Sequence, residues 1–347
     1  MNILVTGGAG FIGSNFVRGL LERRGDARVV VFDKLTYAGN LENLQDCCDG
    51  ERCRFIRGDI ADAAAVANAL TPDFDAVVNF AAETHVDRSI EDAQPFLRTN
   101  VTGTFTLLEA TRRARVPRFV QVSTDEVYGP AEPGTAFAED GVLRPSSPYA
   151  ASKAAADLLV RACGVTYGLS AVIVRLSNVF GPRQFPEKLI PLAIAHASDG
   201  KPVPLYGDGL QERDWLFVDD ACRGIECALE RGRPGETYHF ATGTTRPNLE
   251  VVLTILRLLG RSESLVQFVQ DRPGHDRRYA LDTRRAHREL AWRPQIEFDE
   301  GIRRTIEWYR ENSGWLARAR SGEYRQYYER HYAYRESLLR NLGVAGH

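Results

Sequence analysis

The strand, glycine turn and helix at the start of the chain constrain its fold more than any other feature. Asn2–Thr6 is a short apolar run, Gly7–Gly13 follows with the spacing Gly-x-x-Gly-x-x-Gly, and a helical pattern continues to about Arg23. Glycines in this context let the backbone approach a pyrophosphate, and the free N–H groups at the helix N-terminus favour an anion. The turn therefore predicts a dinucleotide site, although a tight turn without a ligand could carry the same glycines.

A carboxylate at the end of the next strand supports the ligand-binding interpretation. Val29–Phe32 is a second buried run, and Asp33 follows it directly. A carboxylate at this place accepts hydrogen bonds from both ribose hydroxyls of a dinucleotide and repels a 2′-phosphate. We therefore expect NAD rather than NADP, a preference that the adjacent Lys34 could soften.

Strands and helices alternate through the first half of the chain. Apolar runs at Arg54–Ile60, Asp75–Phe80 and Arg118–Val122 predict further strands, while helical patterns cover residues 95–115 and begin again at Pro148. This rhythm predicts an α/β fold, namely a Rossmann-type doubly wound parallel sheet that binds ligands at the carboxyl ends of its strands.

The second half is less regular. Helical patterns and a short strand alternate there, at 188–198, 219–231, 236–240, 249–259 and 299–311. We predict an NAD-binding domain over residues 1–180, to which pieces near 207–240 return. A smaller, discontinuous α/β substrate-binding domain is expected to interleave with it over residues 181–330.

Composition argues against several classes of partner. A formal net charge of −2 over 347 residues gives no support to nucleic acid or an anionic membrane as the main partner. The longest apolar runs, such as 76–82, are far shorter than the roughly 20 residues that span a bilayer, and a basic leader is not seen. The six cysteines and seven histidines show no metal-ligand spacing. We therefore expect no metal site, reduced thiols and a cytoplasmic protein.

Two short motifs contain the groups with acid–base chemistry. Thr124–Glu126 follows a strand and offers a hydroxyl and two adjacent carboxyl groups, while Tyr149 and Lys153 are four residues apart on a helix. That spacing places both side chains on one helix face. An ammonium favours the phenolate form of a nearby phenol, so Tyr149 is a candidate base near neutral pH.

Together these motifs resemble the extended short-chain dehydrogenase/reductase family of nucleotide-sugar enzymes. Thr124–Glu126 is similar to the pattern of dTDP-glucose 4,6-dehydratases. Epimerases of the family usually carry small neutral residues there, and UDP-glucuronate decarboxylases and GDP-mannose 4,6-dehydratases typically have serine in place of the aspartate. Further matches, within a similarity that runs from the first strand to at least Trp315, are 82–89, 185–191, Arg213–Trp215 and 271–279.

The resemblance implies a hydro-lyase that turns a nucleotide-linked glucose into its 4-keto-6-deoxy form for deoxysugar biosynthesis. Tyr149 would take the C4 hydroxyl proton while a hydride moves to NAD, Lys153 would stabilise the phenolate, and Thr124 would hydrogen-bond the C4 oxygen. Glu126 would then remove the C5 proton, and Asp125, held protonated, would release the C6 hydroxyl as water. NAD is regenerated in every turnover and is expected to stay tightly bound.

Motifs and resemblance together imply two sets of binding residues. Those expected around NAD are Gly7, Gly10, Phe11, Ile12, Gly13, Asp33, Lys34, Thr36, Asp59, Ile60, Ala81, Ala82, Thr84, Thr99, Tyr149, Lys153 and Asn178. Those expected around the sugar nucleotide are His85, Thr124, Asn178, Glu187, Lys188, Leu189, Pro204, Tyr206, Arg213, Asn248, Asp271, His275 and Tyr279.

Several of these assignments have alternatives. Asp59 and Ile60 could edge an adenine ring or be a turn aspartate and a core isoleucine, and His85 could touch substrate or cap a loop. Arg213 suits a diphosphate clamp because a guanidinium matches phosphate in a bidentate way, but it could be a surface arginine paired with Asp214.

One departure from the family pattern concerns the substrate. Relatives often read Ser-Asn-Asn-Tyr-Gly-Pro where this chain has Val179 in place of the second asparagine. Thymine and uracil nucleotides both remain open, as do a UDP-glucose 4,6-dehydratase, an epimerase or decarboxylase, and a non-catalytic NAD-binding scaffold. The family also implies a homodimer through the helices predicted at 95–115 and 148–167.

Overall fold

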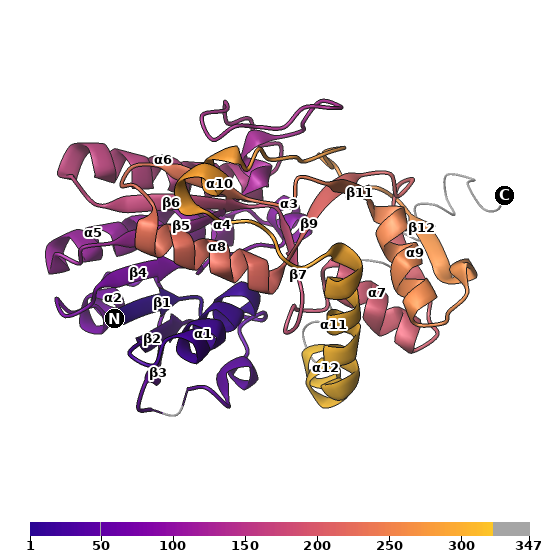
Figure 1. Ribbon diagram of the computed structural model, residues 1–347, viewed down its shortest axis with the longest axis horizontal. Coiled ribbons are helices and arrows are strands. Elements are labelled where there is room, and N and C mark those ends of the chain that lie inside the picture. Colours follow the sequence, from indigo (N-terminus) through magenta and orange to yellow (C-terminus); the bar gives the residue numbers. More distant parts are fainter. Residues whose placement is uncertain (49, 322–347) are drawn as a thin grey trace.

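A seven-stranded parallel sheet forms the larger part of the molecule (Figure 1). The structure is a computed structural model that describes residues 1–48 and 50–321. The strand order is β10-β6-β5-β4-β1-β2-β3, and the strands are β1 Asn2–Thr6, β2 Arg28–Asp33, β3 Cys53–Arg57, β4 Ala76–Asn79, β5 Phe119–Thr124, β6 Ala171–Leu176 and β10 Thr237–Phe240. The direction of winding reverses between β1 and β4, which is where open α/β sheets bind ligands. The predicted fold class is confirmed.

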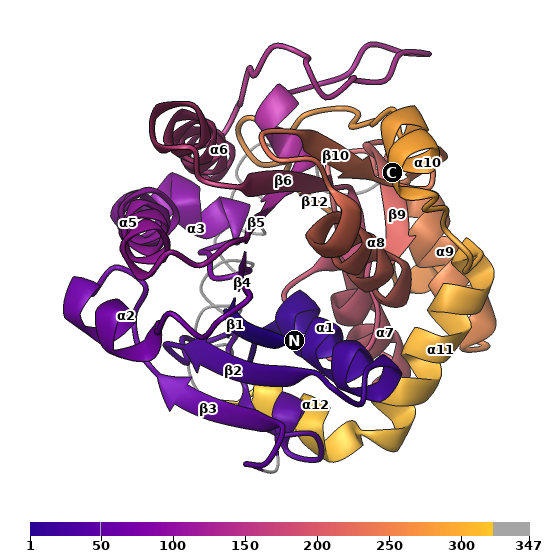
Figure 2. The ribbon, with the colours of Figure 1, turned by 60° about the vertical axis from the view of Figure 1, so that its left-hand side comes forward.

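Helices cover both faces of this sheet (Figure 2). One face carries α1 (Phe11–Arg23) and α8 (Val218–Arg231), and the other carries α2 (Ala63–Ala69), α5 (Thr104–Ala114) and α6 (Pro148–Tyr167). Two apolar clusters fill the layers, because the buried strands present Val, Ile and Leu to both sides. The sheet is therefore a rigid, dry support for the groups at its carboxyl edge.

A smaller part lies beside the sheet, at the right of Figure 1. It has two short sheets, β11-β9-β7 and β12-β8, built from β7 Asn178–Phe180, β8 Val203–Tyr206, β9 Glu212–Phe217, β11 Thr245–Pro247 and β12 Val266–Val269. An apolar cluster around Phe180 and Phe217 joins them to α7 Leu189–Ser198, α9 Asn248–Leu258, α11 Phe298–Glu311 and α12 Ser313–Ala319. From the 207–240 region, β10 joins the large sheet and α8 packs on one of its faces. The domain boundaries remain a prediction.

The helix predicted over 95–115 is not uniform. It comprises α4 (Gln94–Phe96), a π-helical stretch η2 (Leu97–Gly103) and α5. Within η2 the side-chain oxygen of Asn100 accepts a hydrogen bond from Glu83 N at 2.9 Å. The side-chain nitrogen of Asn100 donates to Glu83 O at 3.0 Å and to Ser152 Oγ at 2.8 Å. These contacts come from distant parts of the chain, so sequence periodicity could not reveal the change of helix type.

One prediction about the cysteines is wrong. The structure joins Cys48 and Cys53 in a disulfide, with their Cα atoms 4.5 Å apart. Cys48 follows the short helix η1 (Leu41–Leu44), and Cys53 begins β3 five residues later, so the disulfide closes a short local loop. The remaining cysteines are free, namely Cys47, Cys163, Cys222 and Cys227.

Among the described residues, no helix combines the length and apolar character needed to cross a bilayer. The same part of the chain contains no group of three or more His, Cys, Asp or Glu side chains placed to hold a metal ion. Most of the Arg- and Tyr-rich C-terminal tail, from residue 322 onward, lies outside the described residues.

Candidate active site

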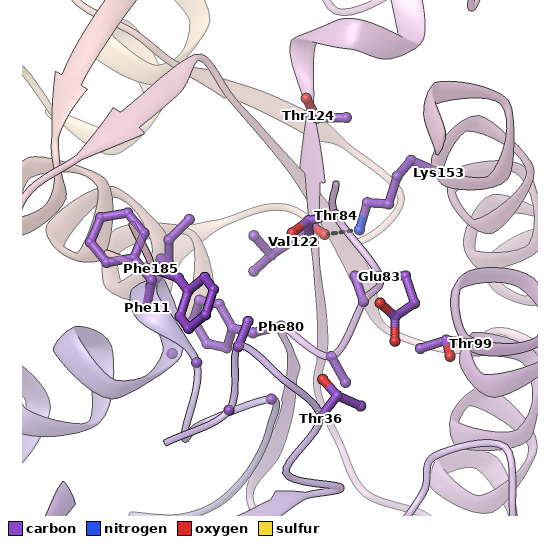
Figure 3. A pocket seen from close by; sticks show the side chains of 18 of the residues that line it. Phe11, Thr36, Phe80, Glu83, Thr84, Thr99, Val122, Thr124, Lys153 and Phe185 are labelled. Atoms are coloured by element: carbon purple, nitrogen blue, oxygen red, sulfur yellow. Dashed lines mark hydrogen bonds between the residues drawn. The ribbon is translucent and has the colours of Figure 1, made fainter. Parts of the chain in front are cut away.

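A cavity of about 300 Å³ opens at the carboxyl edge of the large sheet. It contains every residue predicted for NAD and all five predicted catalytic residues, and of the sugar-nucleotide set it contains Thr124, Asn178, Glu187 and Lys188. In Figure 3, Phe11 and Phe185 lie on one side of this space, and Lys153 reaches in from the opposite side. The candidate cofactor and catalytic groups therefore share one enclosure.

The glycine turn is shaped for close backbone approach. Gly7 has φ +68°, and a Cβ atom there would lie 2.5 Å from the backbone nitrogen of Ala81. A Cβ on Gly13 would lie 2.3 Å from the carbonyl oxygen of Gly7. α1 begins after Gly10 without a side-chain cap, so its first N–H groups face the cavity uncapped. This cradle fits a pyrophosphate.

Asp33 is held at the end of β2 by the backbone around the turn. One carboxylate oxygen accepts from Ala9 N at 3.0 Å and the other from Leu35 N at 2.8 Å. Burial raises the pKa of Asp33, and these two hydrogen bonds oppose the rise. Lys34 turns away and pairs with Asp59 Oδ2 at 2.9 Å. The carboxylate is thus placed for ribose hydroxyls, as NAD requires.

Tyr149 and Lys153 lie one turn apart near the start of α6. Pro148 occupies the first turn, and Ser147 Oγ caps the helix by accepting from Ala150 N at 3.1 Å. Both functional side chains are buried, 7% and 5% exposed, and Lys153 Nζ donates to Val122 O at 2.7 Å, the dashed line in Figure 3. Burial lowers the pKa of Lys153 to about 8.

The predicted lowering of the Tyr149 pKa is not found in this structure. Burial raises the pKa of Tyr149, the negative charge of Glu126 adds to the rise, and a hydrogen bond with Thr124 only opposes it. Lys153 directs its ammonium at Val122 O instead of at the phenol. The phenolate therefore needs a further positive charge in the cavity.

Asp125 and Glu126 lie in a one-turn 3-10 helix, η3 (Asp125–Tyr128), directly after β5. Thr124 caps this turn: its hydroxyl accepts from Glu126 N and donates to Asp125 Oδ1, both at 3.2 Å. Burial raises the pKa of Asp125 to about 8, and the charge of Glu126 adds to the rise. Asp125 is thus protonated at neutral pH beside a second carboxyl group, as an acid beside a base requires.

The other residues predicted for the sugar nucleotide form a neighbouring cluster outside the cavity lining. His85 lies 3.7 Å from Glu187 and 3.9 Å from Asp87. Tyr206 donates to Asp87 at 3.2 Å, and its ring is 6.0 Å from that of His275.

The remaining predicted residues of this cluster are connected through His275 and Asp271 or belong to nearby elements. His275 lies 2.6 Å from Asp271, whose other oxygen accepts from Gln211 at 2.8 Å. Asn248 N donates to Gln211 O at 3.0 Å, and Pro204 belongs to β8. Leu189 starts α7 and packs on the apolar cluster of the smaller part.

Arg213 is not a surface arginine. It is 4% exposed, its guanidinium lies 4.2 Å from the centre of the Tyr279 ring, and it donates to Asp276 O at 2.9 Å. Asp214 instead accepts from Thr242 and Gly243. The alternative pairing is therefore wrong, and the charge of Arg213 is available to the buried acidic groups of the site.

Sequence reasoning missed two side chains that belong to this region. Arg272 is half-buried, and its Nε, which is shielded from solvent, has no hydrogen-bond partner within the described part of the chain. Burial lowers its pKa, but the charges of Asp87 and Glu126 more than compensate, so the pKa is raised. Tyr37 donates at 3.1 Å to Glu187, which lines the cavity. The place of Arg272 within the matched segment 271–279 could have indicated its role. Tyr37 lies in none of the matched segments, so nothing in the sequence indicated its contact.

The comparisons with known proteins agree with this site. The family described as GDP-mannose 4,6 dehydratase matches residues 4–305. A dTDP-glucose 4,6-dehydratase from Streptomyces niveus is 50% identical over 91% of this chain and 94% of its own. The chain belongs to the dTDP-glucose 4,6-dehydratase family. A crystal structure of a family member from Streptomyces venezuelae with NAD bound has a TM-score of 0.89 and 51% identity, covering 92% of this chain and all of the other.

A more distant likeness shows that the fold extends beyond the family. A UDP-glucose 4-epimerase from Thermus thermophilus, in complex with NAD, has a TM-score of 0.83 and 35% identity, covering 89% of this chain and 99% of its own. The fold is thus shared with epimerases. Family membership agrees with the resemblance drawn from the Thr124–Glu126 motif.

Proposed function

We propose that this protein dehydrates dTDP-glucose to dTDP-4-keto-6-deoxyglucose with NAD as a resident cofactor. The observation that carries the proposal is the pair Asp125 and Glu126 in the same cavity as Tyr149, Lys153 and the glycine turn. A ketone-forming site needs only a phenol and a lysine. Elimination of water additionally needs an acid and a base, and Asp125 and Glu126 supply them.

The residues around the cavity fit NAD. The glycine cradle and the start of α1 would hold the pyrophosphate, Asp33 the ribose hydroxyls, and Lys153 the nicotinamide ribose. Bound NAD accepts the C4 hydride and returns it to C6, and its positively charged ring favours the phenolate of Tyr149. That charge is the one the buried phenol lacks in the protein by itself.

The protein groups move protons in a fixed order. Tyr149 takes the C4 hydroxyl proton, and Thr124 donates a hydrogen bond to the C4 oxygen. The new C4 ketone acidifies C5, whose proton passes to Glu126. Asp125 protonates the departing C6 hydroxyl, so water leaves as the C5–C6 double bond forms. Glu126 returns its proton to C5 when C6 is reduced. Tyr149 then gives up the proton that it took from the C4 hydroxyl, and Asp125 regains the proton that left with water, which balances the reaction.

Two arginines are suited to the nucleoside diphosphate, the buried Arg213 and the half-buried Arg272. Arg213 and Arg272 both lie within reach of the charge of Glu126, and Arg272 has an unpartnered Nε among the described residues. We infer that the diphosphate neutralises them, since a buried guanidinium is stabilised by a bidentate anion. Asn178, whose Oδ1 also has no partner in the described chain, faces the cavity nearby.

A homodimer working in the cytoplasm is part of the proposal. Apolar side chains are exposed on the helices predicted to pair, including Phe105 at 45%, Leu158 at 57% and Val165 at 82%. Exposed apolar groups gathered on neighbouring helices suit a contact with a second copy. Measurement of molecular mass in solution tests this point.

The decisive experiment is incubation of the purified protein with dTDP-glucose and, separately, UDP-glucose. The expected product of dTDP-glucose is lighter than its substrate by one water, and in D2O it carries deuterium at C5. A preference for UDP-glucose would mean that the substrate carries uracil and not thymine, whereas a product of unchanged mass would identify an epimerase. Glu126→Gln should lose the exchange at C5, and unimpaired exchange in that variant would exclude Glu126 as the base.

A further inference from the structure

A buried polar network connects the two catalytic segments behind the cavity. Tyr128 ends η3, the turn that carries Asp125 and Glu126, and it is 1% exposed. Its ring stacks on Phe137 with centroids 4.9 Å apart and the planes at 10°. Tyr128 is not among the residues that line the cavity, so its hydroxyl acts on protein groups and not on substrate.

The hydroxyl of Tyr128 has two close partners with defined roles and a longer contact, 3.4 Å, with the carbonyl oxygen of Glu139. Arg175 Nη1 donates to it, and His239 Nε2 lies 2.7 Å away. His239 Nδ1 lies 3.0 Å from the carbonyl oxygen of Asp282, which can only accept, so the proton of the neutral ring is on Nδ1. Nε2 is then an acceptor, and Tyr128 donates to it. The phenol is thus oriented by one donor and one acceptor.

Arg175 links this turn to the helix that carries Tyr149 and Lys153. It lies on β6, opposite Ser123 of β5. Its Nε donates to Asp157 Oδ2 at 2.9 Å, and the two side chains are 6% and 1% exposed. Asp157 lies on α6 one turn after Lys153, and its charge supports the protonated form of that lysine. A buried ion pair of this kind is fixed in geometry.

We propose that Tyr128, Arg175 and Asp157 form a positioning network that holds η3 against α6. The sugar whose C4 hydroxyl proton Tyr149 removes is thereby kept within reach of Asp125 and Glu126. The proposal rests on the proposed function, because it concerns the order of oxidation and elimination. None of the three groups has a part in the proton transfers described above. Displacement of a catalytic group by about 1 Å can slow a reaction by about 10²-fold.

The test uses Tyr128→Phe in the NAD-loaded protein. This variant keeps the ring stack on Phe137 and removes only the hydroxyl. Reduction of bound NAD in a single turnover should change less than about twofold, while formation of the dehydrated product should fall about tenfold or more. Reduced cofactor should therefore accumulate.

Tyr238→Phe is the matched control. Tyr238 is fully buried on β10, and its hydroxyl accepts from Arg233 N at 3.1 Å and donates to Glu289 at 3.0 Å. The variant Tyr238→Phe loses a similar buried hydroxyl, but one that contacts neither η3 nor α6. The ratio of the rate of NAD reduction to the rate of product formation should therefore stay at the wild-type value. An equal effect of Tyr238→Phe and Tyr128→Phe would mean general loss of stability and would overturn the proposal. Equal slowing of both half-reactions in Tyr128→Phe would do the same.

Hydrogen exchange separates this proposal from the proposed function. Backbone amides of residues 125–129 should exchange faster in NAD-loaded Tyr128→Phe than in wild type or Tyr238→Phe, whichever sugar nucleotide the enzyme uses. Unchanged exchange there would overturn the network. Failure of wild type to dehydrate any sugar nucleotide would instead overturn the proposed function.

Discussion

The two catalytic segments meet in one cavity, yet they are built in different ways. α6 is a long capped helix, and the spacing of Tyr149 and Lys153 follows from helical periodicity alone. η3 is a single 3-10 turn in which Asp125 and Glu126 are adjacent, and its geometry depends on the Thr124 cap. Local structure is enough to place the first pair. Surrounding contacts must place the second.

Burial also has opposite consequences for the two segments. Exclusion of water raises the pKa of Asp125 to about 8 and so keeps it in the acid form that its role requires. The same burial raises the pKa of Tyr149, whose role requires the phenolate. A dry cavity therefore prepares the elimination acid without further help, whereas the oxidation base depends on the charge of bound NAD.

Loss of the α6 base should have the largest effect. Tyr149→Phe removes the group placed to take the C4 proton, so both oxidation and elimination should fall by about 10²- to 10⁴-fold. Product formation and cofactor reduction are measured together. Tyr167→Phe, on the same helix but 55% exposed, is the control and should keep wild-type rates. A Tyr149→Phe rate near wild type would assign the oxidation base elsewhere.

Loss of the η3 acid should affect only the second half of the reaction. Asp125→Asn keeps the shape and hydrogen bond of the protonated acid but cannot release a proton to the C6 hydroxyl. We expect elimination to slow by about 10²-fold while sugar oxidation continues, so NADH accumulates and is visible by its absorbance. If this variant dehydrates normally and accumulates no NADH, the distinction between the segments fails.

The pH dependence sharpens the same distinction. Asp125 acts as an acid and has a pKa of about 8, so it loses its proton as the pH rises through that value. The single-turnover elimination rate should therefore fall by about tenfold per pH unit above 8, and the residual rate of Asp125→Asn should lack this decline. A wild-type rate that stays level across this range would show that Asp125 is not the acid.

Glu187 offers the smallest test, since it belongs to neither segment. Burial raises its pKa to about 7 from an ordinary 4.5. Because the folded-state pKa is the higher one, its stabilising contribution is full below about pH 4.5 and is lost as the pH rises to about 7. The free energy of unfolding of the wild type should fall by up to about 3 kcal/mol relative to that of Glu187→Gln over this pH range. Urea unfolding of both NAD-loaded proteins at several pH values measures this difference. If the two unfolding free energies change in parallel with pH, the raised pKa of Glu187 is contradicted.

The parts of the site that could be predicted share a local cause. The glycine turn, Asp33 and the Tyr149–Lys153 pair each follow from positions a few residues apart within one element, and all line the cavity as expected. The π-helical η2 and the disulfide of Cys48 with Cys53 were missed. The change of helix type in η2 depends on contacts of Asn100 with Glu83 and Ser152 from other parts of the chain. The disulfide closes a local loop of two cysteines five residues apart, and hydrophobic periodicity holds no information about such a pair.

By itself the sequence determined the alternation of strands and helices and the edge of the sheet where the cavity lies, and it indicated the candidates for the acid, the base and the phenol. Those features follow from residue type and short-range spacing. Only the tertiary structure decided the protonation states of Asp125 and Tyr149, the burial of Arg213, and the link through Arg175. Desolvation and charge depend on what surrounds a group in space, and distant segments of the chain provide those surroundings.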